Sequence, residues 1–196
     1  MNRSISFRRD PEAATALLAW YRGLEEDPAA RARLRRASTP VEVSYEPAYH
    51  RLLHALLPFA GERLAEGLGV AAVAGLGAHV REHVPGSSPA AQLAAVGRRG
   101  DAKVSEGRFR RLLAVEDPAE RYAHLVRIVR LLGLRVDLLC LADAAYRWDP
   151  KTRQTWAYDY YANAFVSART DRGAKAHERV PAAAPADLVS AVELEP

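Results

Sequence analysis

Residues 118–132 have the sequence PAERYAHLVRIVRLL, in which apolar side chains recur with the period of an α-helix. One face of that helix carries five apolar residues, Tyr122, Leu125, Val126, Val129 and Leu132. The opposite side carries three polar ones, His124, Arg127 and Arg130. A helix of this kind buries one face against its neighbours, so the segment predicts a packed helical protein.

The same pattern extends outward along the chain, because an N-cap residue directly precedes proline at Asp10, Asp27, Ser88, Asp117 and Asp149. Such a pair is typical of a helix start. The pairs and the apolar periodicity together predict helices at 11–25, 28–37, 46–57, 59–82, 89–99, 105–114, 118–132, 137–147 and 150–168. The one strand-like fragment, residues 41–43, is too short to found a sheet. We therefore predict an all-α fold, a two-lobe bundle of about eight or nine helices.

Two composition changes suggest how the chain is divided. The sequence VPGSSP at residues 84–89 is rich in turn-forming residues and predicts a boundary between two lobes, 1–84 and 85–170. Residues 171–196 are rich in alanine and proline without periodicity, which predicts a flexible tail. Four glycines at 67, 69, 75 and 77 are expected to allow close helix packing or a helix break.

Basic residues are clustered, although the net charge is only +4 from 28 basic and 24 acidic residues. Residues 31–36 contain four arginines and no acid, and residues 98–111 contain six basic residues against two acidic ones. Clustered charge of one sign on a folded body is typical of nucleic-acid binding. The alternative is a solvated surface whose arginines pair with the chain's own acids.

The segment KVSEGRFRRLL at residues 103–113 combines this charge with an apolar face. Ser105 is expected to cap a helix with its side chain. One face then carries Phe109, Leu112 and Leu113, and Arg108, Arg110 and Arg111 point away from it. Seven aromatic residues elsewhere could stack on bases, but most are expected in the core or an interface: Trp20, Tyr21, Trp148, Trp156, Tyr158, Tyr160 and Tyr161.

No motif supports catalysis, and we expect no catalytic residue, metal or cofactor. His79-Val-Arg-Glu82-His83 matches the H-x-x-E-H pattern of zinc hydrolases, and both histidines would share a helix face. A third zinc ligand is missing, so a solvated helix end is the favoured interpretation. The lone Cys140 lies in an apolar run and is expected to be a small buried residue. The first residues lack a signal-peptide core and no segment could span a membrane, so we expect a cytoplasmic protein.

Three blocks resemble the CasB family, the small subunit of the type I-E CRISPR complex Cascade. They are ARARLRRASTPVEVSYEPAYHRLLHALL at 30–57, KVSEGRFRRLL at 103–113, and LVRIVRLLGLRVDLLCLADAAYRWDPKTRQTWAYDYY at 125–161. The resemblance implies a non-catalytic antiviral-defence protein, present as two copies beside the large subunit and the backbone subunit. It would stabilise guide RNA paired with target DNA and hold the displaced strand.

The residues that the resemblance and the charge pattern together suggest as phosphate contacts are Arg31, Arg33, Arg35, Arg36, Lys103, Arg108, Arg110 and Arg111, with Arg127 and Arg130 second in rank. Two other functions stay open at this point. One is a metal-dependent hydrolase that uses His79, Glu82 and His83. The other is a helical adaptor that binds protein only.

Overall fold

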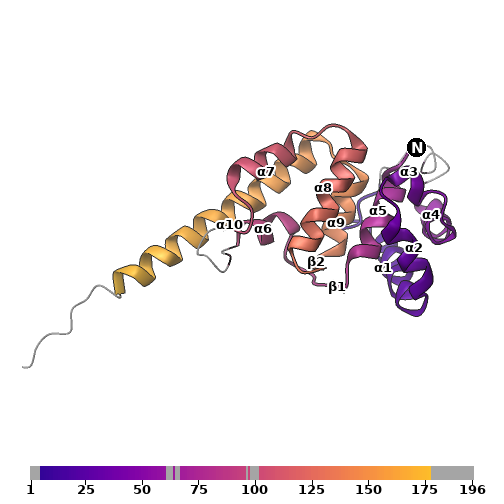
Figure 1. The fold of residues 1–196 in the computed structure, drawn as a ribbon, viewed down its shortest axis with the longest axis horizontal. Coiled ribbons are helices and arrows are strands. Elements are labelled where there is room, and N and C mark those ends of the chain that lie inside the picture. Colours follow the sequence, from indigo (N-terminus) through magenta and orange to yellow (C-terminus); the bar gives the residue numbers. More distant parts are fainter. Residues whose placement is uncertain (1–4, 61–63, 65–66, 96, 98–101, 178–196) are drawn as a thin grey trace, which may run out of the picture.

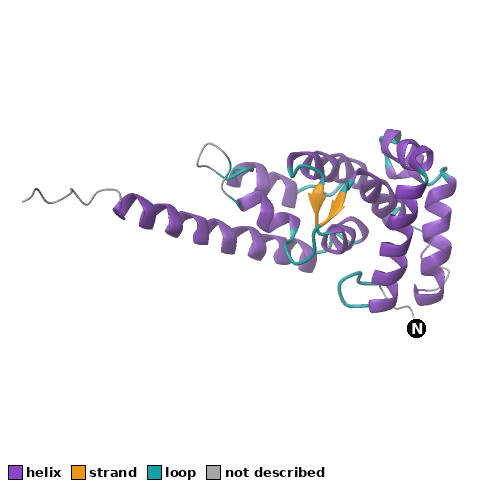
Figure 2. Cartoon of the chain, turned by 90° about the horizontal axis from the view of Figure 1, so that it is seen from below, coloured by secondary structure: helices purple, strands orange, loops and turns teal. Residues whose placement is uncertain are grey.

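The computed structural model describes residues 5–60, 64, 67–95, 97 and 102–177, with 166–177 described as helix backbone only. This part of the chain is almost entirely helical (Figures 1 and 2). Its helices are α1 (Pro11–Glu26), α2 (Pro28–Arg36), α3 (Pro40–Val43), α4 (Pro47–Ala60), α5 (Gly69–His79), α6 (Pro89–Ala94), α7 (Glu106–Leu113), α8 (Pro118–Leu131), α9 (Leu138–Tyr146) and α10 (Pro150–His177). The predicted all-α fold is confirmed.

The proline-marked helix starts are as expected. The side chains of Asp27, Ser88, Asp117 and Asp149 each accept a backbone N–H three residues further on, at 2.9, 3.2, 2.7 and 2.7 Å. Each bond satisfies a donor that the first helical turn would otherwise leave unpaired. Asp10 differs, because its carboxylate accepts the backbone N–H of Ser6 at 2.8 Å.

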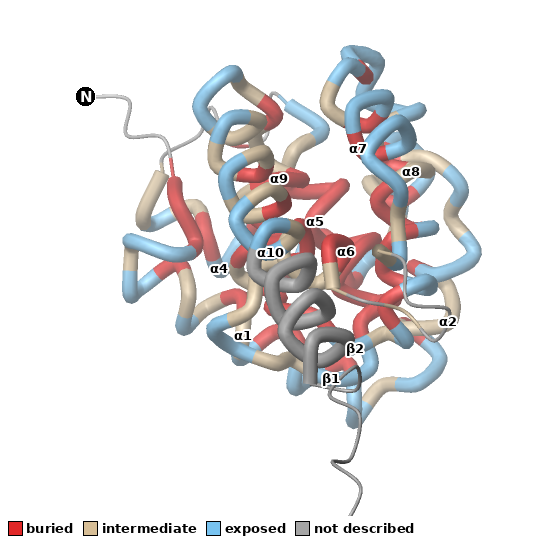
Figure 3. The backbone as a smooth tube through the Cα atoms, turned by 90° about the vertical axis from the view of Figure 1, so that its left-hand side faces the viewer, coloured by how far each residue is buried: buried red, intermediate tan, exposed pale blue. Residues whose placement is uncertain are grey.

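Helix α5 lies at the centre, and every residue from Val70 to His79 is buried. Figure 3 shows this buried segment enclosed by helices with exposed outer faces. Close approach requires glycine here: a Cβ on Gly75 would lie 2.9 Å from Tyr122 Cζ, and one on Gly77 would lie 3.0 Å from Trp20 Cζ3. The expected close packing at these glycines is confirmed. The single helix predicted over 59–82 is wrong, because α4 ends at Ala60 and α5 begins at Gly69.

Two further segments differ from expectation. Residues 41–43 belong to helix α3, whose first turn is capped by Thr39 through a bond from the Glu42 N–H at 3.2 Å. A short parallel pair joins β1 (Glu82–His83) to β2 (Arg135–Val136). The turn before β2 places Gly133 and Leu134 at φ values of 72° and 64°. That turn aims the carbonyl of Leu134 at the N–H of Arg81, 2.8 Å away.

Figure 1 shows α1–α5 at its right, α8 and α9 beside them at the centre, and α6, α7 and α10 to the left. One continuous cluster of buried residues runs through the shared interior of all these helices, and α5 packs against α8 and α9. The lobe boundary at residues 84 and 85 stays a prediction. Helix α10 projects beyond the body and continues to His177, nine residues past its predicted end, so residues 171–177 of the expected tail are helical (Figure 2). Residues 178–196 of that tail lie outside the described residues.

Candidate nucleic-acid interface

Helix α7 holds the basic residues of segment 103–113. Glu106 in its first turn and Arg110 and Arg111 in its last turn match the helix dipole. Ser105 stands at the N-cap position, but its side chain makes no cap bond, which corrects the expected role. Its backbone carbonyl accepts the N–H of Arg108 and of Phe109, both at 3.0 Å.

An aromatic platform fixes α7 against α10. Phe109 is fully buried and stacks on Tyr160 with ring centroids 4.0 Å apart and planes 9° from parallel. The rings of Tyr161 and Phe109 are T-shaped with centroids 6.3 Å apart, and the Tyr160 hydroxyl donates to the carbonyl of Val104 at 2.7 Å. Leu112 is also buried and Leu113 is partly buried, so the predicted apolar face is confirmed.

The charged side of α7 faces solvent. Lys103, Arg108, Arg110 and Arg111 are all exposed. Arg110 pairs with Glu106 at 2.7 Å, and Arg111 donates through Nε to the carbonyl of Gly107 at 3.3 Å. Both contacts lie within α7, the Arg110 side chain stays 70% exposed, and an exposed pair of this kind is weak. The neighbouring pair at positions 98 and 99 lies outside the described residues.

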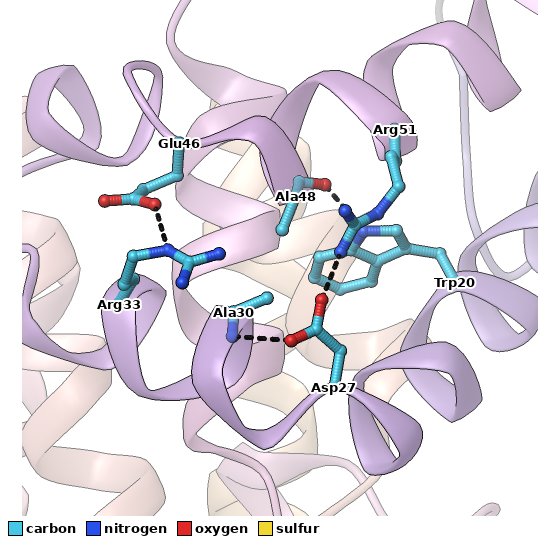
Figure 4. Close-up of polar contacts among 7 residues, drawn as sticks. All are labelled: Trp20, Asp27, Ala30, Arg33, Glu46, Ala48 and Arg51. Atoms are coloured by element: carbon cyan, nitrogen blue, oxygen red, sulfur yellow. Dashed lines mark hydrogen bonds and ion pairs between the residues drawn. The ribbon is translucent and has the colours of Figure 1, made fainter.

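Helix α2 divides the cluster 31–36 into two inward and two outward arginines. The Arg31 guanidinium donates to the carbonyls of Ala78, at 3.2 Å, and of Val80, and it lies 5.7 Å from the ring centre of Tyr21. Arg33 donates to Glu46 at 3.0 Å, and the two side chains point toward each other in Figure 4. These contacts tie α2 to α5 and to the start of α4.

The outward residues of α2 are Arg35 and Arg36, which are exposed in its last turn. Neither makes a salt bridge with another residue of the described ranges. Arg127 and Arg130 on α8 are likewise exposed and have no carboxylate partner among the described residues. Within those ranges, neither of this second pair forms an ion pair across a helix interface.

Buried His79, the last residue of α5, is affected by positive charge from the last turns of both α2 and α8. Burial, together with the positive charges of Arg130 and Arg35, lowers the pKa of His79 to about 4. The two arginines are far apart in sequence but act on the same imidazole. Helices α7, α8 and α2 also follow one another along the same side of Figure 3. We call the exposed basic residues on these helices, together with Lys103, the basic track. Its members are Arg35, Arg36, Lys103, Arg108, Arg110, Arg111, Arg127 and Arg130.

The H-x-x-E-H segment does not have the helical geometry that a zinc site of this pattern requires. Helix α5 ends at His79, so the histidines at 79 and 83 do not share a helix face, and His79 is buried rather than solvated. Glu82 pairs with Arg135 at 2.8 Å, and His83 Nδ1 accepts the N–H of Leu138 at 3.0 Å. The described part of the chain contains no group of three or more side chains that could hold a metal ion.

Cys140 is a small buried residue, as expected. Only 8% of it is exposed, and burial, with the nearby charge of Asp137, raises the pKa of its thiol to about 12. A thiol of that kind is not a nucleophile at neutral pH.

The sequence model of the family described as CRISPR-associated protein Cse2 matches residues 30–161, which is most of the chain. The chain belongs to the Cse2 family. The match spans α2 to the first half of α10 and therefore includes the basic track. It confirms the CasB family recognised from sequence, the small subunit of Cascade. Cse2 is a non-catalytic subunit, so the prediction of no enzymatic activity is confirmed.

The fold of this Cse2 protein is similar to that of a chain in the crystal structure of E. coli Cascade bound to a PAM-containing dsDNA target. The TM-score is 0.58 and the identity 22%, covering 75% of this chain and 95% of the other. No curated protein matches the sequence. Within the described ranges, no helix is long and apolar enough to cross a membrane.

Proposed function

We propose that this Cse2 protein binds the phosphate backbones of nucleic acids in Cascade through its basic track, independently of the nucleotide sequence. The observation that carries the proposal is the two-sided character of α7. Phe109 and Leu112 are buried on one side, and Arg108 and Arg111 face solvent on the other. Guanidinium groups held on a fixed helix suit phosphate oxygens, which they can bind bidentately.

Eight residues form the proposed phosphate contacts: Arg35, Arg36, Lys103, Arg108, Arg110, Arg111, Arg127 and Arg130. Arg31 has a different proposed role, because its guanidinium is engaged by the carbonyls of Ala78 and Val80. It positions α2, so that the last turn of the helix presents Arg35 and Arg36. Arg33 is 41% exposed in its side chain and pairs with Glu46, so it could reach a phosphate only by leaving that carboxylate.

Such a grip is useful when a guide RNA opens a DNA duplex. The RNA–DNA hybrid is about as stable as the duplex that it replaces, so modest contacts to the displaced strand can favour the open state. We propose guide RNA, target DNA and the displaced strand as ligands. The large subunit, the backbone subunit and a second copy of this chain are the proposed protein partners. A likeness to a chain of DNA-bound E. coli Cascade supports this assignment.

The test compares two triple charge reversals in the full chain. R108E/R110E/R111E should weaken binding to a labelled oligothymidine by about two orders of magnitude, because three attractions become repulsions. R8E/R9E/R22E changes the net charge equally, at exposed arginines outside the track, and should have a much smaller effect. Circular dichroism should show unchanged helicity in both. Equal losses in the two variants would refute the proposed track, and no binding by the wild type would favour a protein-only adaptor.

A further inference from the structure

Helix α10 carries two large aromatic side chains in solvent. Tyr158 is 69% exposed and Phe165 is 68% exposed. They are seven residues apart, so both lie on one face of the helix, about 10 Å apart along its axis. The core-facing side of the same helix buries Trp156 and Tyr160 almost completely. The two exposed rings therefore add nothing to the core.

The basic residues of α7 border this exposed face. Tyr161 lies between the two rings along α10, and its hydroxyl accepts a hydrogen bond from Arg110 Nε at 3.3 Å. The same hydroxyl donates to Glu106 at 3.3 Å. Arg110 is thereby held beside the aromatic face, and Arg111 follows it in the last turn of α7.

We infer that this face binds unpaired bases of a single strand, with Tyr158 and Phe165 as stacking platforms. The inference rests on the proposed function and adds how the strand is held, namely by stacking of its unpaired bases as well as through its phosphates. Exposed rings beside cationic side chains are what sequence-independent single-strand binders use. The arginines hold phosphates while each ring takes a separate base, since the rings are too far apart to share one. A paired base is already stacked within its duplex and cannot use them.

The charge beside the rings argues for nucleic acid rather than for an apolar protein surface. A protein partner that covered Tyr158 and Phe165 would also have to cover Arg110, which is exposed beside Tyr161. Arg110 pairs with Glu106 at 2.7 Å, but that pair is exposed, so a protein that buried it would also have to compensate for the lost hydration of both charges. A strand of nucleic acid supplies negative charge and flat apolar rings together.

The test uses an oligothymidine and an abasic strand of equal length, which have the same phosphates but differ in bases. The wild-type chain should bind oligothymidine at least about tenfold more tightly than the abasic strand. Y158L/F165L should lose this preference and leave the affinity for the abasic strand unchanged. Y45L is the matched control, because Tyr45 is 73% exposed on the segment after α3, and it should retain the full preference.

Each outcome separates the inference from the proposed function. Equal wild-type affinity for the two strands refutes stacking and leaves the phosphate grip standing. Loss of both affinities in R108E/R110E/R111E, with the preference intact in the wild type, supports both proposals. A Y158L/F165L chain that keeps the preference but changes its sedimentation mass would show that the rings contact a second copy, and would overturn the inference. If neither strand binds the wild type, both proposals fail together.

Discussion

Replacing Phe109 by alanine tests whether the arginines of α7 stand on a rigid platform. The ring is fully buried, stacked on Tyr160 with centroids 4.0 Å apart and T-shaped to Tyr161 with centroids 6.3 Å apart. Truncation removes these contacts and leaves a cavity between α7 and α10. Phenylalanine-to-alanine changes at such sites cost about 3–5 kcal/mol of the free energy of unfolding. We expect a loss in the lower half of that range, because α7 is short and its outer side can settle toward α10.

The assay is urea unfolding followed by circular dichroism, with Phe165→Ala as the matched control. Phe165 is 68% exposed, so the same substitution there should change the free energy of unfolding by less than about 0.5 kcal/mol. A folded F109A chain should also bind oligothymidine more weakly than the wild type, although every arginine is retained. If F109A unfolds within about 1 kcal/mol of the wild type, the platform does not hold α7 and the argument for preorganised arginines is wrong.

Three further predictions concern the interior. His79 has a folded pKa of about 4, below its ordinary 6.5, so folding favours its neutral form. The free energy of unfolding should therefore be unaffected above pH 6.5 and fall by up to about 3 kcal/mol as the pH drops toward 4. Denaturation of H79Q over the same pH range should lack this part of the loss. Gly75→Ala should destabilise the chain by about 1–3 kcal/mol, because its Cβ would lie 2.9 Å from Tyr122 Cζ. Gly107→Ala, with open space around it, should be neutral or stabilising, and thermal melts compare the two variants. Arg31→Gln should cost about 1–3 kcal/mol, because the carbonyls of Ala78 and Val80 both lose the guanidinium and Val80 keeps only the Tyr21 hydroxyl at 3.3 Å. An equal cost for Arg35→Gln would contradict the inward and outward division of α2.

The helices were predictable because residues within one turn of each helix start determine where it begins. A capping side chain followed by proline, as at Asp117, acts within one turn, and the apolar period of residues 118–132 identifies the buried face. The break between α4 and α5 was missed because its glycines were compatible with either close packing or a break. Residues 41–43 were interpreted as strand-like because two of the three are valines, which favour strands, although Thr39 caps a helix there.

The candidate site was predictable in part. The two faces of α7 follow from the spacing of Phe109, Leu112 and the arginines, and the structure shows them as expected. The inward arginines of α2 could not be recognised, because the partner of Arg33 is thirteen residues away and the acceptors of Arg31 are backbone carbonyls more than forty residues away. No local pattern distinguishes such an arginine from a solvated one. The exposed side of α10 could not be predicted for a related reason. Tyr158 and Tyr160 are the same residue type, yet Tyr158 is exposed and Tyr160 is buried.

The central claim is that this chain holds phosphates with exposed arginines, and the salt dependence of single-strand binding tests it most directly. The eight proposed contacts predict that the logarithm of the binding constant falls with the logarithm of salt concentration with a slope of about −6. Neutralising three of them in R108Q/R110Q/R111Q should reduce that slope to about −4. A wild-type slope near zero, or an unchanged slope in the variant, would contradict the account.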